Sequence, residues 1–217
     1  MAVIEGGASA ALQDVGTNTK GGRVELRPPD VGVLGAYGVT LESGTMAAGL
    51  GAAAPIVSCR WGDATRTMVL QRVGITAKNL TTAFSAGVTL FDLILARSFT
   101  ASDSAGTAAT LTGNNAKRRT SFGTSLVTDL RASSTATLTA GTRTLDTHAI
   151  GFARGFVPAT VVNYAFVGNN VMNLAGASTF AYTGEYLELY RLNHTNEWPV
   201  VFVQNEGVLV RATVPAT

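Results

Sequence analysis

The feature that most constrains this fold is a series of short β-favouring segments separated by turn residues. Val, Ile, Thr and Phe are enriched in these segments, as is typical of strands. The clearest of them are 56–61, 65–76, 88–99, 184–192, 199–204 and 208–214. No long helical pattern interrupts the series. Short strands at this spacing predict an all-β fold, and we expect a β-sandwich with jelly-roll-like topology.

Local signals add detail to this expectation. The pair Gly62-Asp63 predicts a hairpin between 56–61 and 65–76, and the turn 205–207 predicts another between the last two segments. Weaker strand signals lie at 23–27, 37–43 and 142–150. The segment 125–131 predicts one or two helical turns. Residues 100–125 form a long Ser/Thr/Gly/Asn loop, and such loops are usually functional or ordered by a neighbour.

The chain of 217 residues suits one domain with an arm. Residues 1–22 are small and polar, with glycine pairs at 6–7 and 21–22, and they predict a flexible N-terminal arm. Residues 23–217 are expected to form a single β-rich domain.

The composition is weakly charged. Charged residues make up 14% of the chain and the formal net charge is +2, so binding to nucleic acid is not indicated. The sequence holds 29 Thr, 32 Ala and 24 Gly, which provide neutral polar surfaces. Few charges leave strand edges poorly protected against association. This favours a surface covered by copies of the chain or by a partner, although a neutral-surfaced monomer remains the alternative.

A membrane segment is not predicted. A spanning helix needs about 20 apolar residues. The longest uncharged apolar stretch, 46–57, is interrupted by Gly and Pro. The N-terminus lacks the basic and apolar regions of a signal peptide.

The residue types that support catalysis or metal binding are sparse. The segment 49–54 reads G-x-G-x-x-A, but Pro55 follows where a nucleotide site needs a helix. His148 and His194 lie apart, and the single Cys59 sits in an apolar segment. An enzyme would need Asp146 and His148 together with a nucleophile that the sequence does not identify. We therefore expect no enzyme activity, no cofactor and no metal site.

Three residues near the first turn, Arg60, Trp61 and Arg66, are candidates for partner contact. Trp and Arg are frequent interface anchors. The alternative, which we favour, is that Asp63 and an arginine close a hairpin and that Trp61 belongs to the core. Within 88–99, Arg97 is expected to pair with Asp92 or with another acid.

The single basic cluster is Lys117, Arg118 and Arg119. Three cations near Phe122 suggest phosphate binding, but such binding normally needs a larger basic patch. A contact with another subunit and a plain solvated loop are the two stronger alternatives, so these residues are also candidates for partner contact.

Several segments resemble structural proteins of tailed bacteriophages, and the resemblance covers roughly residues 23–217. They are 27–30 (RPPD), 34–37 (LGAY), 43–50 (SGTMAAGL), 60–66 (RWGDATR), 91–93 (FDL) with 96–98 (ARS), 106–115 (GTAATLTGNN) with Lys117 and Arg119, and 205–215 (NEGVLVRATVP). Proteins of this type mostly have no assigned activity, so no catalytic residue is carried over.

The resemblance implies a part of the phage particle, made in the cytoplasm of the bacterial host. Head decoration (cement) proteins are commonly small, β-rich and oligomeric. The resemblance does not indicate which part of the particle this is. Together with the low charge, the Gly-rich arm and the lack of catalytic motifs, it favours a capsid decoration protein that binds the major capsid protein as a homo-oligomer, with a trimer ahead of a dimer. A tail, neck or fibre component is the first alternative. A β-sandwich module that binds host glycans is another.

Overall fold

The computed structural model describes residues 12–14, 20–22, 35–46, 50–78, 87–113, 116–157, 165–166, 187–192 and 198–215. The chain forms two compact units, Met1–Leu34 and Gly35–Thr217. In the first unit, β1 (Leu12–Asp14) pairs antiparallel with β2 (Lys20–Gly22). The predicted strand at 23–27 lies outside the described residues, and the flexibility of the arm stays a prediction.

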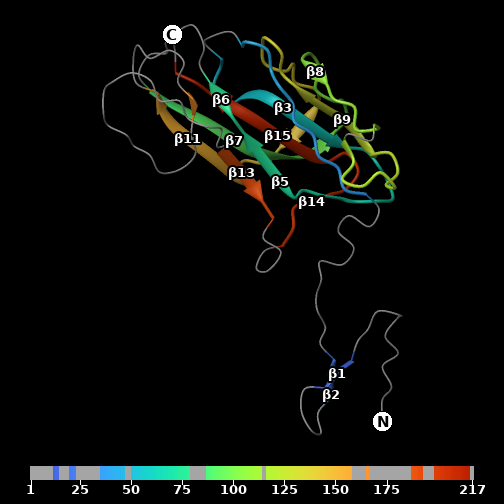
Figure 1. Ribbon diagram of the computed structural model, residues 1–217. Coiled ribbons are helices and arrows are strands. Elements are labelled where there is room, and N and C mark those ends of the chain that lie inside the picture. The colour runs from blue at the N-terminus through green and yellow to red at the C-terminus, as the bar shows by residue number, and fades with distance from the viewer. Residues whose placement is uncertain are drawn as a thin grey trace. The chain divides into compact units, whose positions relative to one another are not determined.

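A seven-stranded antiparallel sheet forms the centre of the second unit (Figure 1). Six strands follow one another across it, in the order β10 (Arg143–Leu145), β7 (Gly87–Phe99), β15 (Gly207–Thr213), β3 (Ala54–Trp61), β9 (Val127–Ala132) and β8 (Thr107–Ala108). The seventh, β11 (Gly151–Val157), pairs with β7 beside β10. The 13-residue β7 is long enough to hold both neighbours along one edge.

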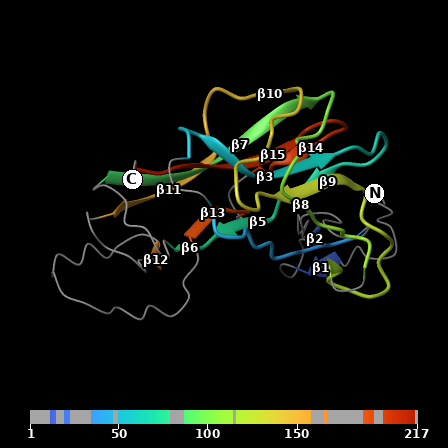
Figure 2. The same ribbon diagram turned by 90° about the horizontal axis from the view of Figure 1, so that it is seen from above.

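A second layer lies against one face of this sheet, as the view in Figure 2 shows for β5, β6 and β13. It consists of three short antiparallel pairs, each with one strand from the segment 68–78. The pairs are β4 (Met68–Val69) with β14 (Val201–Phe202), β5 (Arg72–Ile75) with β13 (Leu187–Arg191), and β6 (Ala77–Lys78) with β12 (Ala165–Phe166).

The main core lies between the two layers. Because side chains alternate along a strand, Phe91, Leu93 and Leu95 of β7 all point to the face that the second layer covers. There they pack with Phe202 and Leu189 of that layer. Each such buried side chain contributes about 1.5–3 kcal/mol relative to an exposed one. The described residues contain no α-helix, and the all-β prediction is confirmed. The arrangement is compatible with a β-sandwich.

The opposite face of the sheet is covered in part. Ile94, Phe99 and Leu209 form a smaller buried cluster there, together with Ala96 and the half-buried Leu145. Towards β11 the same face carries exposed apolar side chains, since Phe152 and Val88 are 63% and 54% exposed. Within the part of the chain that the structure describes, no helix is long and apolar enough to cross a membrane.

Both predicted hairpins are wrong, although their turns are in place. β3 pairs with β15 and β9, so both of its edges are taken and the chain beyond Gly62 leaves for the second layer. Likewise, β14 pairs with β4, whereas β15 enters the main sheet. Each turn therefore connects two layers rather than two neighbouring strands of one sheet.

Other local predictions had mixed outcomes. The predicted helical turn at 125–131 is wrong, because residues 127–132 form β9 and join the sheet. The strand predicted at 142–150 shortens to β10, and 37–43 keeps one bridge, between Tyr37 and Lys117. Of the strand predicted at 184–192, residues 184–186 lie outside the described residues and the rest contains β13. The sequence did not predict β11. The strand predicted at 88–99 is confirmed as β7.

Candidate functional site

The residues considered for catalysis in the sequence do not form a catalytic group with the described residues. Arg97 holds the carboxylate of Asp146 with bonds from Nε and Nη2, and these bonds lower the pKa of Asp146. His148 is exposed. Burial, assisted by the charge of Asp129, raises the pKa of the Cys59 thiol to about 12, which disfavours the reactive thiolate. Among the described residues, no three His, Cys, Asp or Glu side chains form a group that could hold a metal ion.

The turn after β3 is closed by Asp63. Its Oδ1 accepts hydrogen bonds from the backbone N–H groups of Thr65 and Arg66, at 2.9 and 2.7 Å. The bond from Thr65 is the main cause of a lowered Asp63 pKa. Trp61 is buried, at 7% exposure, and its Nε1 donates to the Arg66 carbonyl at 2.8 Å. Trp61 is therefore a core residue, as the favoured alternative predicted, and not an exposed partner contact. The expected Asp–Arg bridge is replaced by bonds to the backbone.

Arg60 also has an internal role. Its Nη1 donates to Ser102 Oγ at 3.1 Å and its Nη2 donates to Asn205 Oδ1 at 2.7 Å. The guanidinium carbon lies 6.0 Å from the centre of the Phe99 ring. These contacts connect β3 with the loop after β7 and with the turn before β15. Of the three candidates near this turn, Arg66 alone is an exposed side chain.

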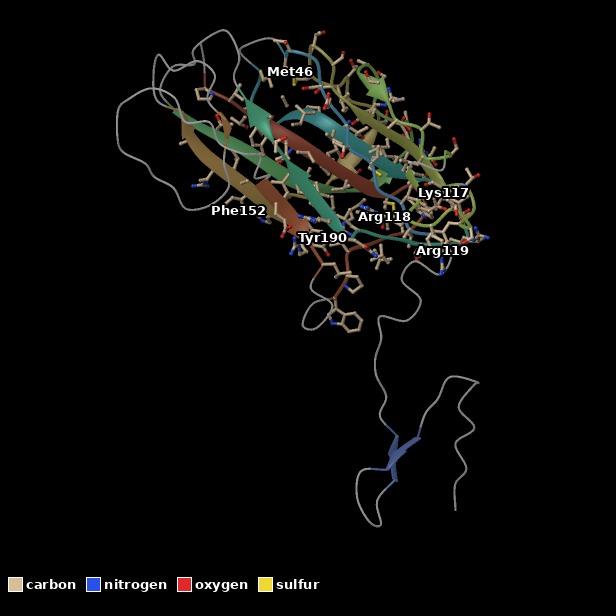
Figure 3. The ribbon with its side chains drawn as sticks, in the orientation of Figure 1. Met46, Lys117, Arg118, Arg119, Phe152 and Tyr190 are labelled. Carbon is tan, nitrogen blue, oxygen red and sulfur yellow. The ribbon has the colours of Figure 1, made fainter. Side chains whose placement is uncertain are left out.

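The predicted basic cluster lies on the surface. We call residues Lys117, Arg118 and Arg119 the basic loop; Figure 3 shows them on neighbouring parts of one side of the domain. Lys117 is half-buried, whereas Arg118 and Arg119 are exposed. A short antiparallel contact anchors the loop: the N–H of Gly38 donates to the Ala116 carbonyl, and the N–H of Arg118 donates to the Ala36 carbonyl, each at 2.8 Å.

The basic loop is not neutralised by the described residues. None of their carboxylates lies within ion-pair distance of Lys117, Arg118 or Arg119. The Arg119 guanidinium lies 5.8 Å from the centre of the Phe122 ring. By contrast, Arg97, Arg131 and other arginines of the domain are paired with acids, as in the bidentate contact of Arg131 with Asp129. The loop is therefore a local excess of positive charge.

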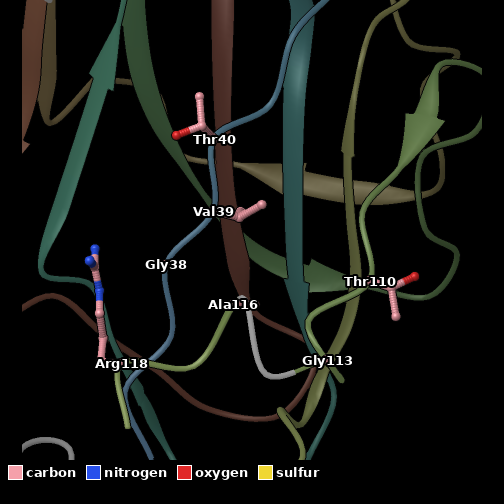
Figure 4. A pocket seen from close by; sticks show the side chains of 7 residues that line it. All are labelled: Gly38, Val39, Thr40, Thr110, Gly113, Ala116 and Arg118. Carbon is pink, nitrogen blue, oxygen red and sulfur yellow. The ribbon is translucent and has the colours of Figure 1, made fainter. Parts of the chain in front are cut away.

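A pocket of about 430 Å³ opens beside the basic loop (Figure 4). Its walls are formed by the segment before β3 and by the loop that follows β8. The lining residues are Gly38, Val39, Thr40, Thr110, Gly113, Ala116 and Arg118. Val39 is 46% exposed there. The site thus combines apolar, hydroxyl and cationic groups.

Sequence reasoning missed the exposed apolar side chains. Phe152 of β11, labelled in Figure 3, and Val88 of β7 lie on the same face of the main sheet. They are four register positions apart, because Phe152 is opposite Asp92 and Val88 is opposite Phe156. A second group contains Trp198, which is 95% exposed, with Val201 and Val203. The alternation in 151–157 (GFARGFV) could have predicted this strand. The sequence could not show which of the strand's two faces carries exposed side chains.

No family model, curated protein or solved structure that was compared with this chain matches it.

Proposed function

We propose that this protein is a non-enzymatic structural subunit of a tailed bacteriophage particle. In the finer form of the proposal, it decorates and stabilises the head as a homo-oligomer, with a trimer ahead of a dimer. The observation that carries the proposal is the exposure of two apolar side chains, Phe152 and Val88, on one face of β11 and β7. Exposed apolar groups on a β-rich domain with 14% charged residues favour burial against another protein.

The basic loop supports the same reading. It presents fixed cations at the surface, and charged groups at an interface guide encounter and register. The resemblance of segments such as 60–66 to phage structural proteins is the reason for proposing that the protein belongs to a phage particle. The major capsid protein is then the expected partner, and a tail, neck or fibre protein is the alternative.

Two measurements test the proposal. Light scattering on the full chain should give an oligomer, and Phe152→Ser should shift it towards monomer while Val203→Ser, an exposed apolar control outside β11, should not. Co-sedimentation with expanded phage heads should then show binding. A stable monomer that does not bind heads would exclude the decoration role, and labelling of tails or necks would select the alternative.

A glycan-binding module is a second candidate, and Trp198 is the observation that favours it. A fully exposed indole can stack on a sugar ring through its apolar face. A glycan array should then give hits that Trp198→Ala abolishes. An array without hits for the unmodified protein would remove this candidate.

A further inference from the structure

The basic loop concentrates three consecutive cations with no acid partner among the described residues. In a domain whose net charge is small, such a local excess is electrostatically unfavourable unless something compensates for it. The loop is also fixed in place by backbone hydrogen bonds to Ala36 and from Gly38. It therefore offers its charges at defined positions.

The guanidinium of Arg118 has a particular resting place. A Cβ built on Gly38 would lie 2.5 Å from Arg118 Nη2, so the side chain can lie here because residue 38 is glycine. Arg118 makes no side-chain hydrogen bond to the described residues. Its N–H donors therefore lie beside the backbone of residue 38, and no described acceptor uses them, so they are available to a bound acceptor.

The pocket beside Arg118 indicates which chemical groups of a ligand would lie next to its negative charge. Val39 and Ala116 supply apolar wall, and Thr40 and Thr110 supply hydroxyl-bearing side chains. A volume of about 430 Å³ accommodates a few side chains of a peptide rather than a large cofactor. A carboxylate beside a small apolar side chain complements this surface.

We infer that the basic loop and its pocket bind an acidic segment of a partner protein, with a carboxylate on the Arg118 guanidinium. Guanidinium and carboxylate match in a planar two-bond geometry. A protein acid is favoured over nucleic acid because the patch has three cations beside an apolar wall, whereas nucleic-acid sites neutralise more phosphates along a longer basic surface. This inference deepens the proposed function, since it names the chemistry of the partner.

The experiment uses the full chain and a fluorescein-labelled peptide of four glutamates and two valines, followed by fluorescence anisotropy. Binding should weaken when NaCl rises from about 20 to about 300 mM, because screening increases. Arg118→Gln should weaken it roughly tenfold, the effect of losing a charge-assisted contact. Arg66→Gln, which removes an exposed arginine elsewhere, should leave it unchanged.

A variant that preserves the charge distinguishes two explanations of binding. One is a contact with the Arg118 guanidinium at a defined position, and the other is a general attraction to positive charge. Gly38→Ala keeps every charge but displaces the Arg118 guanidinium, and it should weaken binding several-fold. Gly51→Ala is its control, because a Cβ at Gly51 meets no atom within 4 Å. Equal binding by both variants would overturn the inference.

Two further results would also overturn it. One is the absence of saturable binding up to millimolar peptide. The other is tighter binding of a single-stranded oligonucleotide of equal charge that is lost in Arg118→Gln, which would indicate a nucleic-acid surface instead. Oligomerisation and head binding through Phe152 are measured separately, so failure of the peptide test leaves the proposed function standing.

Discussion

Arg211 and Asp92 lie opposite each other on neighbouring strands and form a two-bond ion pair. Nε of Arg211 donates to Oδ1 of Asp92 at 2.7 Å, and Nη2 donates to Oδ2 at 2.8 Å. They are register partners of β15 and β7. The sequence raised Asp92 as a partner of Arg97, but Arg97 pairs with Asp146 instead. The pair therefore fixes the alignment of the two central strands on the face that also carries Phe152.

Removing the acid of this pair should destabilise the fold. The two side chains are 20% and 12% exposed, so Asp92→Ala leaves a mostly buried guanidinium without its partner. We expect a loss of about 2–3 kcal/mol in the free energy of unfolding, measured by urea denaturation. Asp146→Ala removes the more exposed pair with Arg97 and should have a much smaller effect. Equal losses in the two variants would contradict the structural role of Asp92.

The Cys59 thiol should be unreactive in the folded protein. With a pKa of about 12 it is almost entirely protonated near neutral pH. A thiol reagent such as DTNB at about pH 8 should label it only after unfolding. Because the folded pKa lies above the reference value of 9.0, this group stabilises the fold below pH 9.0 and loses that contribution as the pH rises towards 12. Rapid labelling of the native protein would show that the thiol is accessible.

The two tryptophans should give opposite fluorescence signatures. Trp61 is buried and Trp198 is 95% exposed. Trp198→Phe should leave a blue-shifted emission that acrylamide quenches weakly. Trp61→Phe should leave a red-shifted, strongly quenched emission and should also lower stability, because it removes the Nε1 bond to Arg66. Strong quenching in Trp198→Phe would mean that Trp61 is exposed after all.

Asp63 should contribute to the loss of stability in acid. Its folded pKa lies below the usual 3.8, so its contribution is present above that value and is lost as the pH falls through the folded pKa. Asp63→Asn keeps an oxygen acceptor but cannot titrate. The midpoint temperature of thermal unfolding should therefore fall less steeply in this variant than in the unmodified protein as the pH is lowered from 7. An equally steep decline in Asp63→Asn and in the unmodified protein would contradict this contribution of Asp63.

Parts of this architecture were predictable because their signals are local. The all-β class follows from short Val-, Ile-, Thr- and Phe-rich segments. The position of β7 follows from its continuous apolar run, which suits a strand buried on both faces. The surface position of the basic loop follows from three adjacent charges. Each of these features depends on residues that are close together in the sequence.

Tertiary structure decided which strands pair and which side chains remain exposed. The turns at 62–63 and 205–207 were predicted, but β3 already has β15 and β9 as neighbours, and β14 pairs with β4. Arg60 and Trp61 become internal because Asn205, Ser102 and Arg66 lie beside them in space. Phe152 remains 63% exposed, although the Arg154 guanidinium of the same strand lies 5.4 Å from the centre of its ring. Strand partners and face coverage depend on contacts between distant residues, so periodicity alone could not determine them.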